Sequence, residues 1–508
     1  MSGDIFDLLV IGGGANGVGI ARDAVGRGLK VALVEQGDLA QATSSASSKL
    51  IHGGLRYLEQ YEFRLVREAL AEREALLAAA PHIITPMRFV LPHEPSQRPA
   101  WMIRTGLFLY DHLARRERLE GSKSVDLRSD MSGAVFRDGY RTAFSYADCF
   151  VDDARLVVLA ALDARERGAC IWTRCTFVGA TVTNNLWRAV IRNLQGREDV
   201  VRARALVNAG GPWVERVQRT CSSAATDARL RMVKGSHLVV PRLYTGEHAY
   251  ILQQPDRRIV FVIPYEERFS LIGTTDVPFD GDPSNVAISP EEIEYLCHAV
   301  STYFAKPVHA ETVVWSYAGV RPLYEDRSGA SPSTVTRDYV FDLEVGGSRP
   351  PLLSVYGGKI TTFRRLAEHA LQKLEPHLPE MRGAWTHRAP LPGGDIPGGD
   401  LNKFIRDISQ DYPFLPPVTV RRLARCYGTR VHNVIGDARE WSGMGEDFGF
   451  GLTSREVAYL VKFEFAHDPE DVLWRRTKLG LHGGSALARK LGDHLGGRHA
   501  QLATMGSP

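Results

Sequence analysis

Residues 7–37, DLLVIGGGANGVGIARDAVGRGLKVALVEQG, decide the fold class of this chain. Two short apolar runs flank a segment that carries small residues on one helical face, which is the pattern of a strand, a helix and a second strand. Glycines stand at the first strand-to-helix turn. The stretch therefore predicts a βαβ unit, the building block of a parallel sheet.

The glycine spacing at this turn, Gly12-x-Gly14-x-x-Gly17, predicts a dinucleotide site. Bare glycines let a pyrophosphate approach the backbone N–H groups at the positive end of a helix. Glu35 ends the second strand, where its carboxylate can accept hydrogen bonds from an adenosine ribose. A tight turn without a ligand would show the same glycines, but the flanking strand and helix and Glu35 together favour nucleotide binding. These residues do not distinguish FAD from NAD.

A run of small residues, Thr43–Ser48, follows this unit and leads into Gly53, Gly54 and Arg56. Serine-rich runs are often solvated linkers, but a linker inside a compact domain is implausible at this place in a βαβ fold. We interpret the run as a continuation of the dinucleotide groove, with hydroxyl and N–H donors for phosphate and flavin oxygens. The glycine pair could then lie against an isoalloxazine ring, and Arg56 could point to the substrate.

The composition excludes several classes of protein. The chain has 508 residues, enough for two or three packed units. Its 62 Lys and Arg against 59 Asp and Glu give a net charge of +3, which argues against a nucleic-acid protein held by bulk charge. The six cysteines form no CxxC pair, so we expect free thiols, a reducing compartment and no metal site. No signal peptide and no apolar stretch of about 18 residues occur, so membrane contact is expected to be peripheral.

Nine segments, in one order along nearly the whole chain, resemble the FAD-dependent, aerobic-respiratory sn-glycerol-3-phosphate dehydrogenases of bacteria. They are VIGGGANGVGIARDA, ATSSASSKLIHGGLRYLE, YADCFVDDARL, LVNAGGPWV, KGSHLVVP, IGTTDVP, AGVRPL, TRDYV and SVYGGKITTFRRLAEHA. GEDFG and VLWRRTKLG extend the resemblance toward the C-terminus. It implies an α/β fold, with a Rossmann-like FAD-binding domain of the D-amino-acid oxidase and glycine oxidase type, an antiparallel β-sheet cap domain and a C-terminal α-helical domain.

Domain boundaries follow from this resemblance and from the pattern along the chain. Short strands alternate from about 171 to 210, and 236–280 has the pattern of an antiparallel sheet. A Gly/Pro-rich linker occupies 388–400, and 401–490 is mostly helical in pattern. We assign 1–80, 140–235 and 340–388 to a discontinuous FAD-binding domain, 81–139 and 236–339 to a substrate-binding cap domain, and 389–508 to the C-terminal helical domain.

The resemblance also implies an activity and its partners. It implies non-covalently bound FAD, and oxidation of sn-glycerol 3-phosphate to dihydroxyacetone phosphate by hydride transfer to the flavin. Electrons would pass to ubiquinone in the respiratory chain. The expected location is the cytoplasm, with peripheral attachment to an anionic surface at the cytoplasmic face of the inner membrane. A homodimer is compatible with this reading, and no nucleic acid is expected.

The reaction needs a phosphate clamp, a proton acceptor and positive charge beside the flavin. Arg56, Arg321 and Arg337 are fork-shaped donors suited to phosphate, although a lone arginine is more often a surface ion-pair partner. His237 has an ordinary pKa suited to proton transfer, and a structural role is an equal alternative. The predicted catalytic residues are His237, Arg321 and Lys359, and the predicted substrate-binding residues are Arg56, Tyr57, Thr275 and Arg337.

The predicted cofactor-binding residues come from the glycine turns, the serine run and the family motifs; no metal ligand is predicted. They are Gly12, Gly13, Gly14, Asn16, Gly17, Glu35, Gln36, Thr43, Ser44, Ser45, Ser47, Ser48, Lys49, Leu50, His52, Gly53, Gly54, Leu55, Phe177, Ala209, Gly210, Trp213, Gly357, Gly358, Ile360, Thr361 and Thr362.

The best local candidate for membrane contact is residues 99–119, PAWMIRTGLFLYDHLARRERL. Helical spacing places one apolar arc against the core or against lipid, while Trp101 and Phe108 fall among polar residues. Exposed aromatics beside basic residues suit an anionic lipid surface. The arc consists of Met102, Ile103, Leu107, Leu109, Tyr110 and Leu113, and the basic residues are Arg115, Arg116 and Arg118.

Three rival functions remain open. A glycerol-3-phosphate oxidase would share the substrate chemistry but use O₂. An amino-acid oxidase of the same fold would need an arginine for a carboxylate and no second phosphate clamp. A non-catalytic FAD-binding scaffold would bind flavin that glycerol 3-phosphate cannot reduce.

Overall fold

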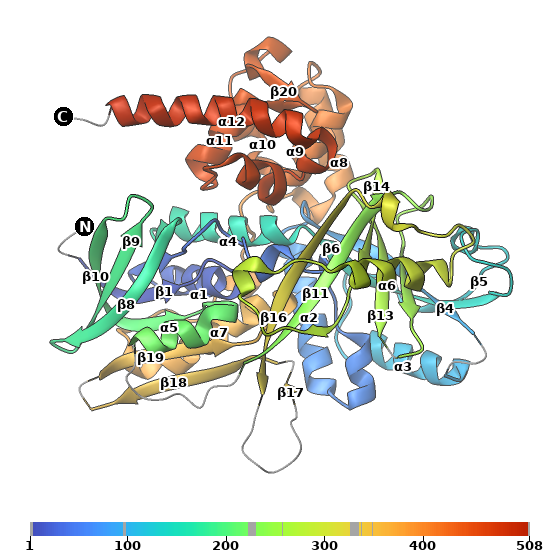
Figure 1. Ribbon diagram of the computed structural model, residues 1–508, viewed down its shortest axis with the longest axis horizontal. Coiled ribbons are helices and arrows are strands. Elements are labelled where there is room, and N and C mark those ends of the chain that lie inside the picture. The colour runs from blue at the N-terminus through green and yellow to red at the C-terminus, as the bar shows by residue number, and fades with distance from the viewer. Residues whose placement is uncertain are drawn as a thin grey trace.

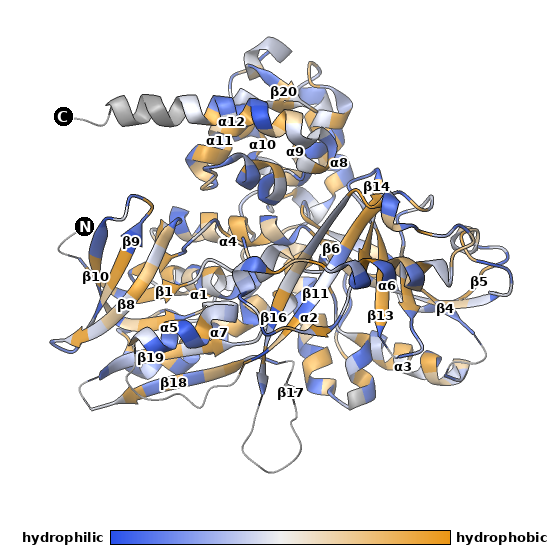
Figure 2. Cartoon of the chain, viewed as in Figure 1, coloured by the Kyte–Doolittle hydropathy of each residue, from blue (hydrophilic) through white to orange (hydrophobic). Residues whose placement is uncertain are grey.

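The computed structural model describes residues 4–94, 98–221, 230–256, 258–325, 335–336, 338–347 and 349–505. Two β-sheets form the body of the molecule, and a helical C-terminal domain lies against them, above α4 and β14 in the view of Figure 1. Apolar residues concentrate inside each part (Figure 2), where they form separate buried clusters. This arrangement confirms the predicted α/β fold with a C-terminal helical domain.

The first sheet has a parallel centre in the order β7-β2-β1-β10-β19. β1 and β2 are apolar almost throughout because helices cover both faces of a parallel sheet. Its strands are β1 (Ile5–Ile11), β2 (Val31–Val34), β7 (Cys170–Trp172), β8 (Cys175–Thr183), β9 (Leu186–Asn193), β10 (Glu198–Asn208), β18 (Val340–Gly346) and β19 (Arg349–Tyr356). Its helices are α1 (Ala15–Gly26), α4 (Asp153–Glu166), α5 (Val214–Cys221) and α7 (Phe363–Leu374).

The second sheet is mostly antiparallel, in the order β17-β16-β11-β14-β13-β12-β4-β6-β3, with β15 beside β11 and β5 beside β6. Its first strands are β3 (Leu50–Ile51), β4 (Ile84–His93), β5 (Lys123–Asp126), β6 (Thr142–Val151), β11 (Leu230–Pro241) and β12 (Ala249–Gln253). The others are β13 (Ile259–Tyr265), β14 (Phe269–Gly273), β15 (Val277–Pro278), β16 (Trp315–Glu325) and β17 (Val335–Thr336). Helices α2 (Phe63–Ala79), α3 (Ala100–His112) and α6 (Pro290–Ser301) pack around this sheet.

The division between the sheets differs from the predicted domain boundaries at three strands. β3 and β6, which the sequence assigned to the FAD-binding domain, pair in the second sheet, and β11 enters that sheet at Leu230. β6 pairs with β4 along ten residues, from Ile84 opposite Val151 to His93 opposite Thr142. A strand joins whichever sheet offers it a backbone partner, and periodicity within the strand does not identify that partner.

The C-terminal domain has its own core but is tied to the first sheet by buried ion pairs. Arg155 on α4 pairs with Glu464, and Arg476 donates to Asp38 at 2.6 and 2.8 Å. The domain contains α8 (Leu401–Asp411), α9 (Pro417–Tyr427), α10 (Val431–Ile435), α11 (Ser454–Phe463), α12 (Gly480–Met505), β20 (Asp447–Gly449) and β21 (Leu452–Thr453).

Only part of the apolar arc predicted in residues 99–119 packs on the core. Leu107 and Tyr110 of α3 are buried, and Ile103 and Leu113 pack partly against the same cluster. The outer face is exposed at Trp101 (68%), Met102, Phe108 (57%) and Leu109. Throughout the residues that the structure describes, we find no helix with the length and apolar character needed to cross a bilayer.

Candidate functional site

A cavity of about 1970 Å³ is lined by residues from both sheets and from the C-terminal domain. Its volume exceeds that of typical pockets for drug-sized ligands, about 300–1,000 Å³, and suits a dinucleotide together with a substrate. Within the described part of the chain, no group of histidine, cysteine or acidic side chains could hold a metal ion. The cavity is therefore the candidate site.

The glycine turn between β1 and α1 has no room for side chains. A Cβ on Gly17 would lie 1.9 Å from the carbonyl oxygen of Gly12, and a Cβ on Gly12 would lie 2.4 Å from that of Ala209. Ser44 accepts a hydrogen bond from the backbone N of Ala15 at 3.0 Å, so a polar side chain already meets the first turn of α1. This end of the cavity can accept a pyrophosphate at a helix N-terminus.

Glu35 is held in place beside this turn. Its carboxylate accepts hydrogen bonds from the backbone N of Gly13 at 2.6 Å and of Gly37 at 2.8 Å. Burial raises the pKa of Glu35, against the effect of these N–H donors. Asn16 donates to the carbonyl oxygen of Gly357 at 3.0 Å, which joins the turn to the second glycine pair.

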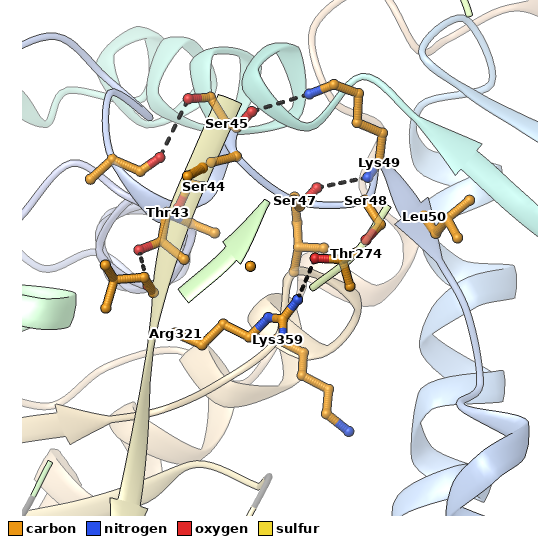
Figure 3. A pocket seen from close by; sticks show the side chains of 18 of the residues that line it. Thr43, Ser44, Ser45, Ser47, Ser48, Lys49, Leu50, Thr274, Arg321 and Lys359 are labelled. Carbon is orange, nitrogen blue, oxygen red and sulfur yellow. Dashed lines mark hydrogen bonds between the residues drawn. The ribbon is translucent and has the colours of Figure 1, made fainter. Parts of the chain in front are cut away.

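The serine run is a wall of the cavity whose side chains are mostly bound to the protein itself (Figure 3). Thr43 donates to the carbonyl oxygen of Val320 at 2.6 Å, and Ser47 donates to the buried carboxylate of Asp153 at 2.7 Å. The ammonium of Lys49 also binds Asp153, at 2.8 Å. The run is thus no linker, but these side chains anchor the wall, which differs from their predicted use as free donors to a cofactor.

His237 lies behind the wall of the cavity rather than in it. Its side chain is 2% exposed, its Nε2 is 2.9 Å from the Oγ of Ser48, and its ring stacks on Tyr317 at 4.8 Å. Burial, and next the positive charges of Arg321 and Lys49, lower the pKa of His237 well below its ordinary value. The imidazole is therefore neutral at pH 7, and it reaches the cavity through Ser48.

Positive side chains also line the cavity. Arg321 donates to Thr274 at 3.0 Å from Nη2, and its Nη1 is 3.6 Å from the carboxylate of Asp276. Figure 3 draws Arg321 and Lys359 in the same wall. The Nζ of Lys359 is 3.9 Å from the ring centre of Tyr57. Together these groups can bind an anion.

The structure brings most of the predicted residues to this one cavity. The predicted residues that line it are Gly12, Gly14, Asn16, Glu35, Gln36, Thr43, Ser44, Ser45, Ser47, Ser48, Lys49, Leu50, His52, Gly54, Leu55, Arg56, Tyr57, Phe177, Ala209, Gly210, Trp213, Thr275, Arg321, Gly357, Gly358, Lys359, Ile360 and Thr361. Gly13, Gly17, Gly53, Thr362 and His237 lie behind this lining. Arg337 lies outside the described residues.

The sequence reasoning missed a contribution from the C-terminal domain. Glu470, Trp474, Arg475 and Lys478 line the cavity. Trp474 stacks on Trp315 of β16 at 4.4 Å between ring centres. The only local signal is the motif VLWRRTKLG, which carries no indication of where it packs.

Comparisons with known proteins agree with this geometry. The model of the family described as FAD dependent oxidoreductase matches residues 7–388, and that of the C-terminal domain of alpha-glycerophosphate oxidase matches 384–493. A glycerol-3-phosphate dehydrogenase from Pseudomonas aeruginosa is 52% identical over 98% of this chain and 96% of its own length.

Two further similarities bear on the substrate and the fold. A D-erythritol 1-phosphate dehydrogenase from Brucella abortus is also 52% identical, over 94% of this chain and 95% of its own length. The solved structure of the glycerol-3-phosphate dehydrogenase from Bacillus halodurans complexed with FAD has a TM-score of 0.76. It is 26% identical and covers 98% of this chain and 92% of that chain.

Proposed function

Because this chain belongs to the FAD-dependent oxidoreductase family, we propose that it oxidises sn-glycerol 3-phosphate to dihydroxyacetone phosphate. FAD is the cofactor of the family, and the residues present fit it. The side-chain-free turn at Gly12 and Gly17, the oriented carboxylate of Glu35 and the large cavity are the features that a dinucleotide requires. When bound, FAD supplies a two-electron acceptor.

The observation that carries the proposal is that a nucleotide-binding turn and a cationic wall line one and the same cavity. Arg56, Arg321 and Lys359 line that wall. Guanidinium forks match a phosphate, and a fixed cation stabilises negative charge that develops on an oxygen. We assign Arg56 and Arg321 to substrate binding and orientation, and Lys359 to the substrate oxygens.

The proton acceptor is assigned to the Ser48–His237 pair. The reaction removes a hydride from C2 of the substrate and a proton from its hydroxyl. Ser48 lines the cavity, and the imidazole of His237 lies 2.9 Å behind it, within reach of a proton passed through the Ser48 hydroxyl. The test is the pH–rate profile of His237→Asn. Apparent pKa values that are shifted or lost relative to the parent would support this assignment, and an unchanged profile would contradict it.

The central experiment is anaerobic addition of sn-glycerol 3-phosphate to the purified holoenzyme. We expect the flavin absorbance to bleach, and sarcosine or D-alanine to leave it unchanged. Bleaching by an amino acid alone would support the amino-acid oxidase. Flavin that no substrate bleaches, but dithionite does, would indicate a scaffold.

A second candidate substrate is D-erythritol 1-phosphate. The two relatives named for these substrates are equally identical to this chain, at 52%. Both substrates offer a phosphate and a secondary hydroxyl, and they differ by one hydroxymethylene unit. The ratio of the two kcat/KM values decides between them.

We further infer that electrons pass to ubiquinone and that the protein attaches peripherally to the cytoplasmic face of the inner membrane. The exposed face of α3 supports this inference: Trp101, Met102, Phe108 and Leu109 stand near an exposed Arg115. The fraction of protein that sediments with anionic vesicles should be lower for a variant that carries both Trp101→Ser and Phe108→Ser. Ubiquinone analogues should support turnover in air without stoichiometric hydrogen peroxide; stoichiometric peroxide would favour the oxidase.

A further inference from the structure

Tyr110, on the inner face of α3, contacts the backbone of the segment that enters the active site. Its hydroxyl accepts a hydrogen bond from the backbone N of Gly53 at 2.8 Å, and the side chain is 2% exposed. A Cβ on Gly53 would lie 2.7 Å from that hydroxyl and 2.4 Å from Leu70. A glycine at position 53 therefore permits the Tyr110 hydroxyl to come this close to the backbone. The Gly53-Gly54 pair in the sequence does not indicate which residue makes this contact.

The orientation of the Tyr110 hydroxyl is fixed by a second buried group. It donates to the carboxylate of Asp148 on β6, at 2.8 and 2.9 Å, and Arg73 on α2 donates to the same carboxylate at 2.6 Å. Arg73 and Asp148 are as buried as Tyr110. Because the hydroxyl proton points to Asp148, a lone pair remains for Gly53. Burial raises the pKa of Tyr110 well above its ordinary value, so the group stays a phenol.

The held peptide precedes residues with assigned roles. Gly54 has a φ of +76°, and the following turn, Leu55–Gln60, carries Arg56 and Tyr57 into the cavity. Lys359 lies over the ring of Tyr57. A shift of the Gly53 peptide would therefore displace the phosphate-binding arginine and the tyrosine that contacts Lys359. Displaced binding groups would weaken the hold on the substrate phosphate in the ground state and the transition state alike, which raises KM and leaves kcat unchanged.

We propose that Tyr110 is a positioning residue for the substrate phosphate: fixed by Asp148 and Arg73, it holds the Gly53 peptide so that Arg56 faces the cavity. This role rests on the proposed function, since it acts through the phosphate-binding residue. It joins three elements, α2, α3 and β6, to the segment that carries Arg56.

The test compares Tyr110→Phe with a matched control, Tyr265→Phe. Tyr265 is buried in the same apolar cluster, and its hydroxyl has no hydrogen-bond partner among the described residues. Both variants lose one buried hydroxyl, but only Tyr110→Phe leaves Gly53 without its acceptor. We expect Tyr110→Phe to raise KM for sn-glycerol 3-phosphate, and the inhibition constant of inorganic phosphate, by at least about fivefold. The kcat value and FAD content should change by less than about twofold.

The outcomes separate this inference from the proposed function. If the parent and Tyr265→Phe are not bleached by sn-glycerol 3-phosphate, the proposed function fails. If they are, and Tyr110→Phe has an unchanged KM, or loses kcat and FAD together, the positioning role is overturned. Should Tyr110→Phe fail to fold, Asp148→Asn serves instead: Arg73 keeps the Oδ1 acceptor, so the new amide N–H faces the phenol oxygen and competes with the Gly53 N–H. This variant should raise KM with kcat retained, and an unchanged KM there overturns the proposal.

Discussion

Two segments that line the cavity are brought there in different ways. The Gly12–Gly17 turn is contiguous in sequence, and it can close only because its glycines have no side chains. Residues 470–478 come from the C-terminal domain, and Arg475 and Arg476 there donate to Asp38, more than 430 positions earlier in the chain. We call these two residues and Asp38 the Asp38 clamp.

The two segments differ in how far apart in the sequence their decisive residues lie. The turn requires glycines at a fixed spacing, which a motif reveals, even though one of them also lies against the backbone of Ala209. The clamp consists of buried charges that stabilise the protein only when both partners are present, so no short stretch shows it. Loss of the turn should remove the cofactor, whereas loss of the clamp should lower stability.

The largest expected effect is that of Gly17→Ala on flavin content. The added Cβ would lie 1.9 Å from the carbonyl oxygen of Gly12, so the turn cannot close. We expect protein that purifies nearly free of FAD, measured by the flavin absorbance per chain. In Gly106→Ala, on α3 and away from the turn, no heavy atom lies within 4 Å of the added Cβ, so this control should keep its flavin. Normal flavin content in Gly17→Ala would contradict the close contact described here.

Next comes Arg476→Met, which breaks the Asp38 clamp at a fully buried pair. Removing one partner of a buried ion pair costs about 3–5 kcal/mol of unfolding free energy, and Arg475, which still binds Asp38, should keep the loss near the lower value. The protein should still bind added FAD at low temperature. Denaturant unfolding measures the loss, with Asp38→Asn in a double-mutant cycle. Additive losses would show that the pair does not act as a clamp.

A smaller effect is expected for Arg321→Lys, which extends the comparison to the substrate end. An ammonium keeps the charge but loses the planar fork that reaches Thr274 and the cavity. A charge-assisted hydrogen bond contributes about 1.5–3 kcal/mol, so kcat/KM should fall roughly 10- to 150-fold while flavin content stays normal. A change of less than about threefold would place Arg321 outside the site.

The smallest effect concerns pH and Glu266, a residue of the cap domain on which the charges of Asp152, Arg425 and Lys478 act. Burial, followed by the charge of Asp152, raises the pKa of Glu266 to about 7. The folded state therefore binds the Glu266 proton more tightly than the unfolded state does. The resulting contribution to the free energy of unfolding is fully present below about pH 4.5 and is lost as the pH rises through 7. Because the side chain is partly exposed, screening should limit it to about 1 kcal/mol. Glu266→Gln should therefore flatten the fall in melting temperature between pH 5 and 8; parallel curves would refute this.

The sequence predicted those parts of the site whose causes are local. The strand–helix–strand unit and the cavity-lining place of the serine run follow from periodicity, glycine spacing and context. His237 shows the limit: its residue type predicted proton chemistry, but only the pairing of β11 with β16 places it against Tyr317 and behind Ser48.

By itself the sequence determined that this protein has a nucleotide-binding βαβ turn, a carboxylate at the end of the second strand and a C-terminal helical domain. Glycine spacing and apolar periodicity are properties of residues that are close in the sequence, so a local pattern reveals them. Only the tertiary structure decided that β3 and β6 join the second sheet, that Arg475 and Arg476 bind Asp38, and that Tyr110 holds Gly53. Strand partners, buried charge pairs and hydrogen bonds to a backbone N–H depend on which distant groups the fold brings within a few ångströms, and no local pattern encodes that choice.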